Sequence, residues 1–179
     1  MRIKTGIVEH ISITGARYMK RNGADPSVSE RTLRFALMLW ISMIFIIMLT
    51  AAGGIFLGVF SEAIAALAVL GLLRYFSGGW HFKQMDACVI FTAAVAIGIA
   101  MMPAIEEIWL IPLNIVSLAL VLLLAPTGHG QKFSNVKQKT AFKWISVILV
   151  TINFVALNQI AVVSTLFQSL TLITRKGGG

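Results

Sequence analysis

The chain has 179 residues, of which 58% are hydrophobic and only 12% charged, and its formal net charge is +8. A soluble domain is about 25% charged, so a water-soluble fold would lack the polar surface that it needs. The composition therefore excludes a soluble globular protein and predicts a membrane protein. Basic residues beside apolar runs are typical of membrane topology and contact with anionic lipid, so we expect no nucleic-acid partner.

Residues 1–28 are predicted to form an amphipathic helix followed by a linker. Ile3, Ile7, Ile11 and Tyr18 recur at helical spacing among basic residues. A plain surface helix is one interpretation. We favour a helix lying in the lipid headgroup region, because an apolar span follows it. Residues 29–176 are then the transmembrane domain, and 177–179 are a flexible tail.

Long continuous apolar runs favour membrane helices over the alternating strands of a barrel. The runs are Leu33–Phe60, Ala63–Leu73, Ala87–Pro103, Trp109–Ala125 and Phe142–Ile173. The second is shorter than the roughly 20 residues of a full span, so we expect a tilted or partly re-entrant segment. The last is either one long tilted helix or a hairpin of two short helices.

Charge placement predicts the topology. Basic residues cluster at 1–34, 74–83, 132–143 and 175–176. The acidic residues Glu62, Glu106 and Glu107 lie in the alternate turns. Because cytoplasmic loops carry the excess of Lys and Arg, both termini and the loop at 74–86 should face the cytoplasm. This assignment requires the hairpin, and it gives an all-α polytopic protein of about six helical segments plus the interfacial helix.

The segment from Arg74 to Cys88 departs from the apolar pattern. It contains Gly78 and Gly79, which give the backbone conformational freedom, then His81 and, seven positions later, the only cysteine of the chain. An imidazole activates a cysteine nucleophile by taking its proton. The sequence therefore suggests a His–Cys pair.

A straight helix would hold residues 81 and 88 about 10 Å apart, so direct contact requires a break between them. We predict that Asp86 is the N-cap of the following helix and that Cys88 lies in its first turn, where the helix dipole favours a thiolate. The ring of His81 should then approach the Cys88 sulfur to within about 3–5 Å.

Structural interpretations stand beside the catalytic one. A lone cysteine in a membrane helix is more often an inert small hydrophobe. Arg74 could extend its guanidinium to the interface, and Lys83 could follow the positive-inside rule. The histidines and the cysteine do not cluster in sequence, so we expect no metal site, and no cofactor is indicated.

The arrangement R-x-x-x-G-G-x-H-x-x-x-x-x-x-C resembles the signature of the accessory gene regulator B (AgrB) family of bacterial membrane peptidases. The matching residues are Arg74, Gly78, Gly79, His81 and Cys88, with Lys83 two places after the histidine. Leu124-Ala125-Pro126, ending a span before a basic loop, is also similar to the family. The loop from Lys132 to Lys143 lacks the Lys-Pro pair that the family tends to carry, which bears on peptide preference.

The resemblance implies a cysteine endopeptidase of the bacterial cell membrane. It would cleave a short AgrD-like quorum-sensing propeptide near its C-terminal part. Cys88 would form a thioester with the substrate, and His81 would be general base and then proton donor. An internal Cys or Ser of the substrate would displace Cys88 and close a thiolactone or lactone ring. Arg74, Gly78, Gly79, Lys83 and Asp86 would support the site, membrane lipid is an expected partner, and a homodimer is compatible with this interpretation.

Two other classes compete with the peptidase. A small transporter or export component would use Asn153, Asn158 and Gln159 as polar lining and would need no reactive thiol. A structural membrane subunit would bind lipid or a partner through its basic N-terminus. Rapid reaction of Cys88 with an electrophile distinguishes the peptidase from both.

Overall fold

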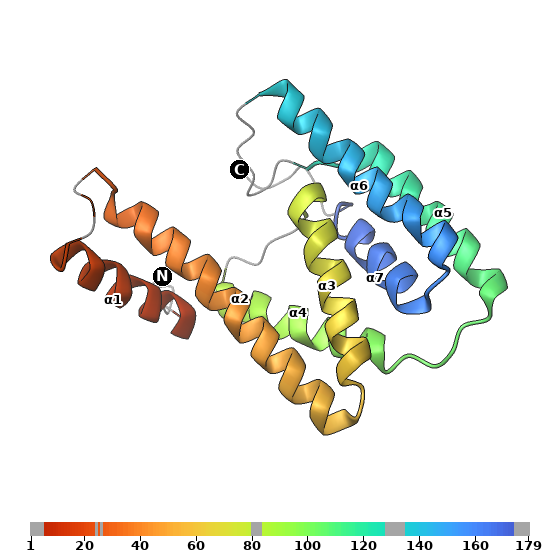
Figure 1. Cartoon of the computed structure of the whole chain (residues 1–179), viewed down its shortest axis with the longest axis horizontal. Helices are drawn as coiled ribbons and strands as arrows, with labels where there is room; N and C mark the ends of the chain where they lie inside the picture. The colour runs from red at the N-terminus through yellow and green to blue at the C-terminus, as the bar shows by residue number, and fades with distance from the viewer. Residues whose placement is uncertain (1–5, 24, 26, 80–83, 128–134, 174–179) are drawn as a thin grey trace. The chain divides into compact units, whose positions relative to one another are not determined.

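The computed structural model describes residues 6–23, 25, 27–79, 84–127 and 135–173. Over these residues the chain forms seven helices and no strand (Figure 1), which confirms the all-α prediction. The helices are α1 (Ile7–Arg21), α2 (Glu30–Leu57), α3 (Phe60–Ser77), α4 (Met85–Ala100), α5 (Glu107–Leu124), α6 (Val136–Ala156) and α7 (Gln159–Leu170).

Four of these helices, α2, α3, α5 and α6, are long and apolar enough to cross a membrane. The helices α4 and α7 are apolar but shorter, so the count of six crossing segments remains a prediction. Large apolar side chains are exposed along the helices; Phe56 of α2 is 88% exposed and Leu123 of α5 is 80% exposed. Such surfaces are costly in water and suit hydrocarbon, so the fold is consistent with a polytopic membrane protein.

The chain divides into two compact units. Unit 1 comprises Met1–Leu49 with Phe82–Ala94, and unit 2 comprises Thr50–His81 with Val95–Gly179. The predicted division at residues 28 and 176 follows hydropathy rather than packing, and it remains a prediction.

Within unit 1, α1 is amphipathic as the sequence predicts. It buries Val8, Ser12 and Ala16 on one side, and it exposes Ile7 and Tyr18 on another. Its last turn carries Lys20 and Arg21, which complement the negative end of the helix dipole.

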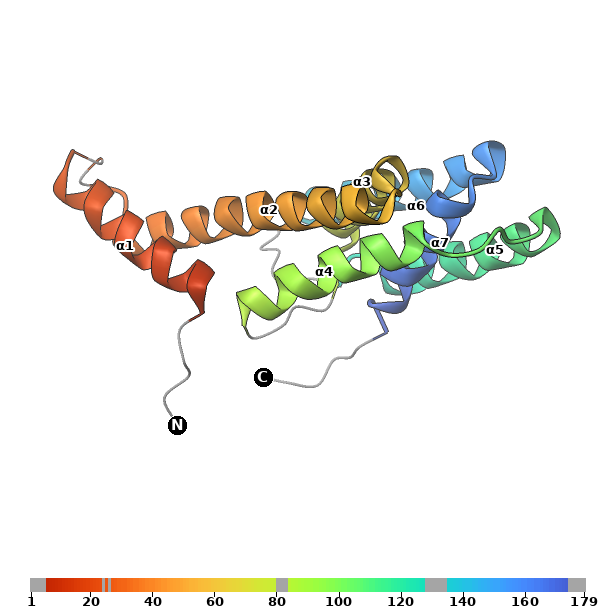
Figure 2. The ribbon, with the colours of Figure 1, turned by 90° about the horizontal axis from the view of Figure 1, so that it is seen from below.

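Within unit 2, α7 lies among α3, α5 and α6 (Figures 1 and 2). One buried cluster joins Leu73 of α3, Val121 of α5, Val150 of α6 and Leu172, which follows α7. A second cluster joins α3 and the end of α4 through Ala66, Leu70, Ala96 and Ile99. Small residues such as Ala66 and Ala96 let helix backbones approach closely where lipid supplies no hydrophobic driving force.

The structure contradicts the prediction for one apolar segment, residues 63–73, and decides between the two alternatives for another, residues 142–173. The expectation that residues 63–73 form a segment too short for a full span is wrong, because α3 has 18 residues, continues to Ser77 and is long enough to cross a membrane. A tilt of this helix stays a prediction. The hairpin alternative for residues 142–173 is correct. Leu157 adopts a left-handed conformation with φ 41°, and the side chain of Asn158 caps α7 by accepting a hydrogen bond from the N–H of Ala161.

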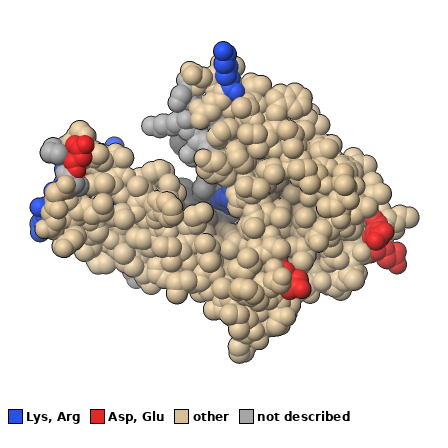
Figure 3. Space-filling model, in the orientation of Figure 1, with Lys and Arg blue, Asp and Glu red and all other residues tan. Residues whose placement is uncertain are grey.

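Acidic and basic residues of unit 2 lie at different ends of its helices. Glu62 lies in the first turn of α3, while Glu106 and Glu107 begin α5. Lys137 and Lys139 lie at the start of α6. Figure 3 shows acidic side chains where α3 and α5 begin, and a basic side chain where α6 begins. This separation is what the positive-inside assignment expects; which end faces the cytoplasm remains a prediction.

Candidate active site

Cys88 closes the first turn of α4. The helix begins at Met85, and the N–H of Cys88 donates to the carbonyl of Gln84 at 3.3 Å. Its side chain is half-buried. The predicted placement of Cys88 in the first turn of a helix is therefore confirmed.

A break between residues 81 and 88 is also confirmed, because α3 ends at Ser77 and α4 begins only at Met85. One continuous helix through both positions is thus excluded. His81 and Lys83 lie outside the described residues, so the approach of the imidazole to the Cys88 sulfur stays a prediction.

The prediction that Asp86 is the N-cap of α4 is wrong. Asp86 lies one residue inside the helix, and Gln84 supplies the carbonyl that begins the α4 hydrogen bonds. The carboxylate of Asp86 instead accepts from the backbone N–H groups of Ile7 and Val8, at the N-terminus of α1. Asp86 therefore caps a helix far away in the sequence.

Gly78 and Gly79 form the turn that ends α3. Gly78 has φ 75° and ψ −150°, and Gly79 has φ 141°. Residues with a Cβ rarely adopt either conformation. The N–H of Gly78 donates to the Arg74 carbonyl at 3.0 Å, which closes the end of the helix. The sequence-based expectation that this turn depends on glycine backbone freedom agrees with these angles.

Gln168 of α7 holds this turn, a role that the sequence pattern did not predict. Its side chain is 2% exposed, and Nε2 donates to the Gly78 carbonyl at 2.8 Å. A Cβ on Gly79 would lie 2.9 Å from Nε2 of Gln168 and 2.8 Å from Oγ1 of Thr171, so the backbone passes close to α7. The signal that was available is a glutamine within an apolar helix, a placement that usually has a function.

Other contacts secure the same end of α3. The Ser77 carbonyl accepts from the N–H of Thr127 at 3.1 Å. The ring of Tyr75 packs tilted against Phe142 of α6, with centroids 6.0 Å apart, and the ring of Phe76 packs edge-to-face against it, with centroids 5.3 Å apart. Arg74 lies half-buried in the last turn of α3, where its charge complements the helix dipole. The end of α3 and the turn up to Gly79 are therefore held by contacts with Thr127, α6 and α7.

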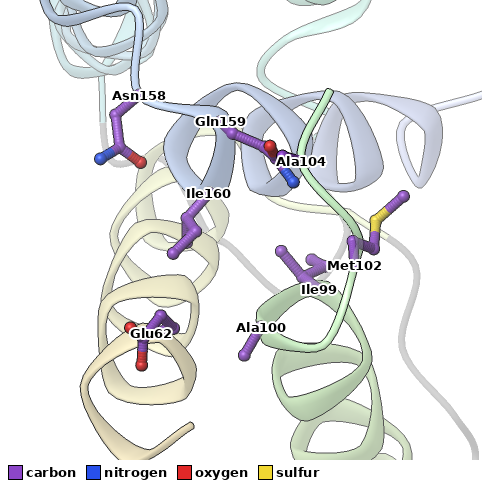
Figure 4. A pocket seen from close by; sticks show the side chains of 8 residues that line it. All are labelled: Glu62, Ile99, Ala100, Met102, Ala104, Asn158, Gln159 and Ile160. Carbon is purple, nitrogen blue, oxygen red and sulfur yellow. The ribbon is translucent and has the colours of Figure 1, made fainter. Parts of the chain in front are cut away.

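A pocket of about 290 Å³ lies elsewhere in unit 2. It is lined by residues from the start of α3, the end of α4 and the start of α7, among them Glu62, Ile99, Asn158 and Gln159 (Figure 4). Glu62 and Gly78 are at opposite ends of α3, roughly 24 Å apart along the helix axis. This pocket is therefore separate from the Gly78–Gly79 turn.

A family model described as accessory gene regulator B matches residues 12–173. The chain belongs to the AgrB family. This match covers nearly the whole chain and includes every residue of the signature from Arg74 to Cys88. Comparison with curated proteins and with solved structures gave no match. AgrB proteins take part in agr quorum sensing as the processing component, and they work with an AgrD-like propeptide.

Proposed function

We propose that this AgrB protein is a membrane-embedded cysteine endopeptidase that cleaves its propeptide near the C-terminal part and allows the signal peptide to cyclise. The observation that carries the proposal is the position of Cys88 at the first turn of α4, within a chain matched over residues 12–173 by the AgrB family. Because α3 ends at Ser77 and α4 begins at Met85, positions 81 and 88 do not lie on one straight helix, which would hold them about 10 Å apart.

The proposed reaction begins with transfer of the Cys88 proton to His81 and attack of the sulfur on a peptide carbonyl carbon. The C–N bond breaks, His81 returns the proton to the leaving amine, and an acyl thioester remains on Cys88. The first N–H groups of α4, such as those of Asp86 and Ala87, are our proposed donors to the oxyanion.

The second half conserves the energy of the cleaved bond. A thiol or hydroxyl within the bound peptide attacks the thioester carbonyl, giving a thiolactone or lactone and regenerating the Cys88 thiol. Water need take no part, which distinguishes the ring-closing route from ordinary hydrolysis.

The transporter interpretation depended on three polar residues of the apolar segments, Asn153, Asn158 and Gln159, and each has a structural hydrogen-bond partner. Asn153 donates to Thr165 at 3.1 Å and joins α6 to α7. Gln159 holds the loop before α5, donating to the Pro103 carbonyl and accepting from the N–H of Ile105, each at 2.8 Å. Asn158 caps α7. These three amides have structural partners, so their presence in the membrane segments no longer argues for a transport path.

The test is propeptide cleavage by variants of Cys88 and His81 in membranes. We expect Cys88→Ala, Cys88→Ser and His81→Ala each to lower the cleavage rate by at least about 10³-fold, because nucleophile and base act as a unit. Membrane levels of the protein should stay as in wild type.

Matched controls come from the other two histidines. His10→Ala, at an exposed position of α1, and His129→Ala should cleave normally. Appreciable processing by Cys88→Ala would remove the proposal. Trapping of a propeptide fragment on Cys88 as a hydroxylamine-sensitive adduct would support the thioester directly.

A further inference from the structure

The carboxylate of Asp86 reaches across 79 positions of sequence to the first turn of α1. The N–H of Ile7 donates to Oδ2 at 2.6 Å, and the N–H of Val8 donates to Oδ1 at 3.1 Å. The first N–H groups of a helix have no acceptor within the helix, and Gly6 at the N-cap has no side chain to supply one. Asp86 thus provides the cap that the sequence around α1 lacks.

Gly6 leaves the room that this contact needs. A Cβ on Gly6 would overlap Oδ2 of Asp86, and it would lie 2.6 Å from Cγ and 2.9 Å from Oδ1. The φ of Gly6 is −71° with ψ 172°, which any residue adopts. The close approach of the carboxylate, and not the backbone conformation, is therefore what calls for glycine at this position.

Ion pairs attach the remainder of α1 to α2 within the same unit. Glu9 pairs with Arg34, and Arg17 pairs with Glu30 at 3.5 Å. With its N-terminus held by Asp86, α1 is attached at both ends. Its exposed apolar residues and basic last turn are those of a helix that lies in the headgroup region.

We infer that Asp86 is a positioning residue, which holds the first turn of α4 against the N-terminus of α1 and so sets where Cys88 lies relative to the membrane surface. Asp86 precedes Cys88 by two residues in the same helical turn. The positive end of the α1 dipole faces its carboxylate and strengthens both hydrogen bonds. A displacement of α1 is therefore passed to the turn that carries the thiol. The consequence for catalysis rests on the proposed function.

A double-mutant cycle tests the inference. Asp86→Ala removes both hydrogen bonds. Gly6→Ala keeps the Asp86 carboxylate but pushes it away from the N-terminus of α1, because the new Cβ would occupy the same space. We expect each variant to lower kcat for propeptide cleavage about tenfold per folded molecule with little change in KM, and the double variant to be no worse than either one. Gly15→Ala is the matched control in α1, because its Cβ meets only the flexible Cδ1 of Leu37, at 3.1 Å.

Amide hydrogen exchange reports the contact without any need for activity. Protection of the Ile7 and Val8 amides should fall in Asp86→Ala and in Gly6→Ala, and it should persist in Gly15→Ala. Unchanged protection in Asp86→Ala would overturn the inference. If the wild-type protein cleaves no propeptide, the proposed function fails, and exchange still decides whether Asp86 holds α1.

The kinetic pattern separates positioning from other roles. If Asp86 acts directly on His81 or substrate, Gly6→Ala will cleave normally, and the inference is lost. If the contact only stabilises the fold, the amount of folded protein falls while kcat per folded molecule stays at the wild-type value, and that result overturns the inference as well.

Discussion

Replacing Gln168 by methionine would remove a hydrogen bond from the Gly78–Gly79 turn while keeping nearly the same side-chain length. Gln168 donates to the Gly78 carbonyl at 2.8 Å from a fully packed position. The hydroxyl of Ser77 also reaches that carbonyl, at 3.2 Å, so the buried acceptor keeps one weaker partner. The cost is that of one net hydrogen bond with part of the desolvation penalty, about 1–2 kcal/mol.

We expect this cost to appear in catalysis, because the turn leads directly into the segment that carries His81. A loss of about 1–2 kcal/mol in the populated conformation of the turn corresponds to roughly 5- to 30-fold slower propeptide cleavage. The assay is the initial cleavage rate in membranes, normalised to the amount of folded protein in the same sample.

Ser169→Ala provides the matched control for Gln168→Met. Ser169 is fully buried beside Gln168, and its hydroxyl donates to the Thr165 carbonyl within α7 at 2.6 Å. Its loss should affect α7 alone and leave the turn in place. If Gln168→Met cleaves as fast as Ser169→Ala, the reasoning that α7 supports the turn is refuted.

Gly79→Ala should reduce cleavage more than it reduces thermal stability, because φ 141° is strained for alanine and a Cβ would press on α7. Gly71→Ala is the control, because a Cβ there would meet open space. Normal processing by Gly79→Ala would show that the turn can be rebuilt without glycine. For topology, a cysteine at exposed Lys139 in a Cys88→Ala background should resist an impermeant thiol reagent in intact cells, and one at Glu106 should react. The opposite labelling pattern would reverse the assignment.

The structure also decides where such a topology probe can be placed. Position 77 lies in the predicted cytoplasmic loop at 74–86, where the sequence alone predicts an accessible residue. Ser77 is fully buried at the end of α3, so a cysteine there would escape the reagent on either side of the membrane. The exposed first turn of α6 gives an interpretable result instead.

Hydropathy and charge predict most of the helices of this protein, since long apolar runs leave few alternatives in lipid. The end of α3 was misjudged because Arg74 looks like the start of a polar loop. An arginine in the last turn complements the helix dipole, and Tyr75 and Phe76 bring rings that pack on α6. A prediction from side-chain polarity alone therefore places the end of α3 too early, at Leu73 instead of Ser77.

The spacing of residues within the signature predicts where helices break near the site, but it does not predict hydrogen bonds between residues far apart in the sequence. The break before α4 was expected because a straight helix would keep His81 and Cys88 apart, and the structure has that break. Cys88 does lie in the first turn of α4, although the N-cap from which that position was predicted is wrong. An aspartate just before an apolar run is ordinarily its own helix cap, yet Asp86 caps α1. The partners of Asp86 and Gln168 lie 79 and 90 positions away, and no periodicity connects them.

The length of α4 bears on the fate of the acyl group that Cys88 would carry. With 16 residues, α4 rises about 24 Å, whereas the hydrocarbon core of a typical bilayer is about 30 Å thick. A helix that falls short by about 6 Å thins the bilayer around it or leaves one end in contact with water. Cys88 lies at the beginning of this helix. If α4 crosses the bilayer with that end in contact with water, bilayer thickness would govern the competition between water and the internal nucleophile of the peptide. Acyl-chain length in the host membrane would then set the ratio of linear to cyclic product.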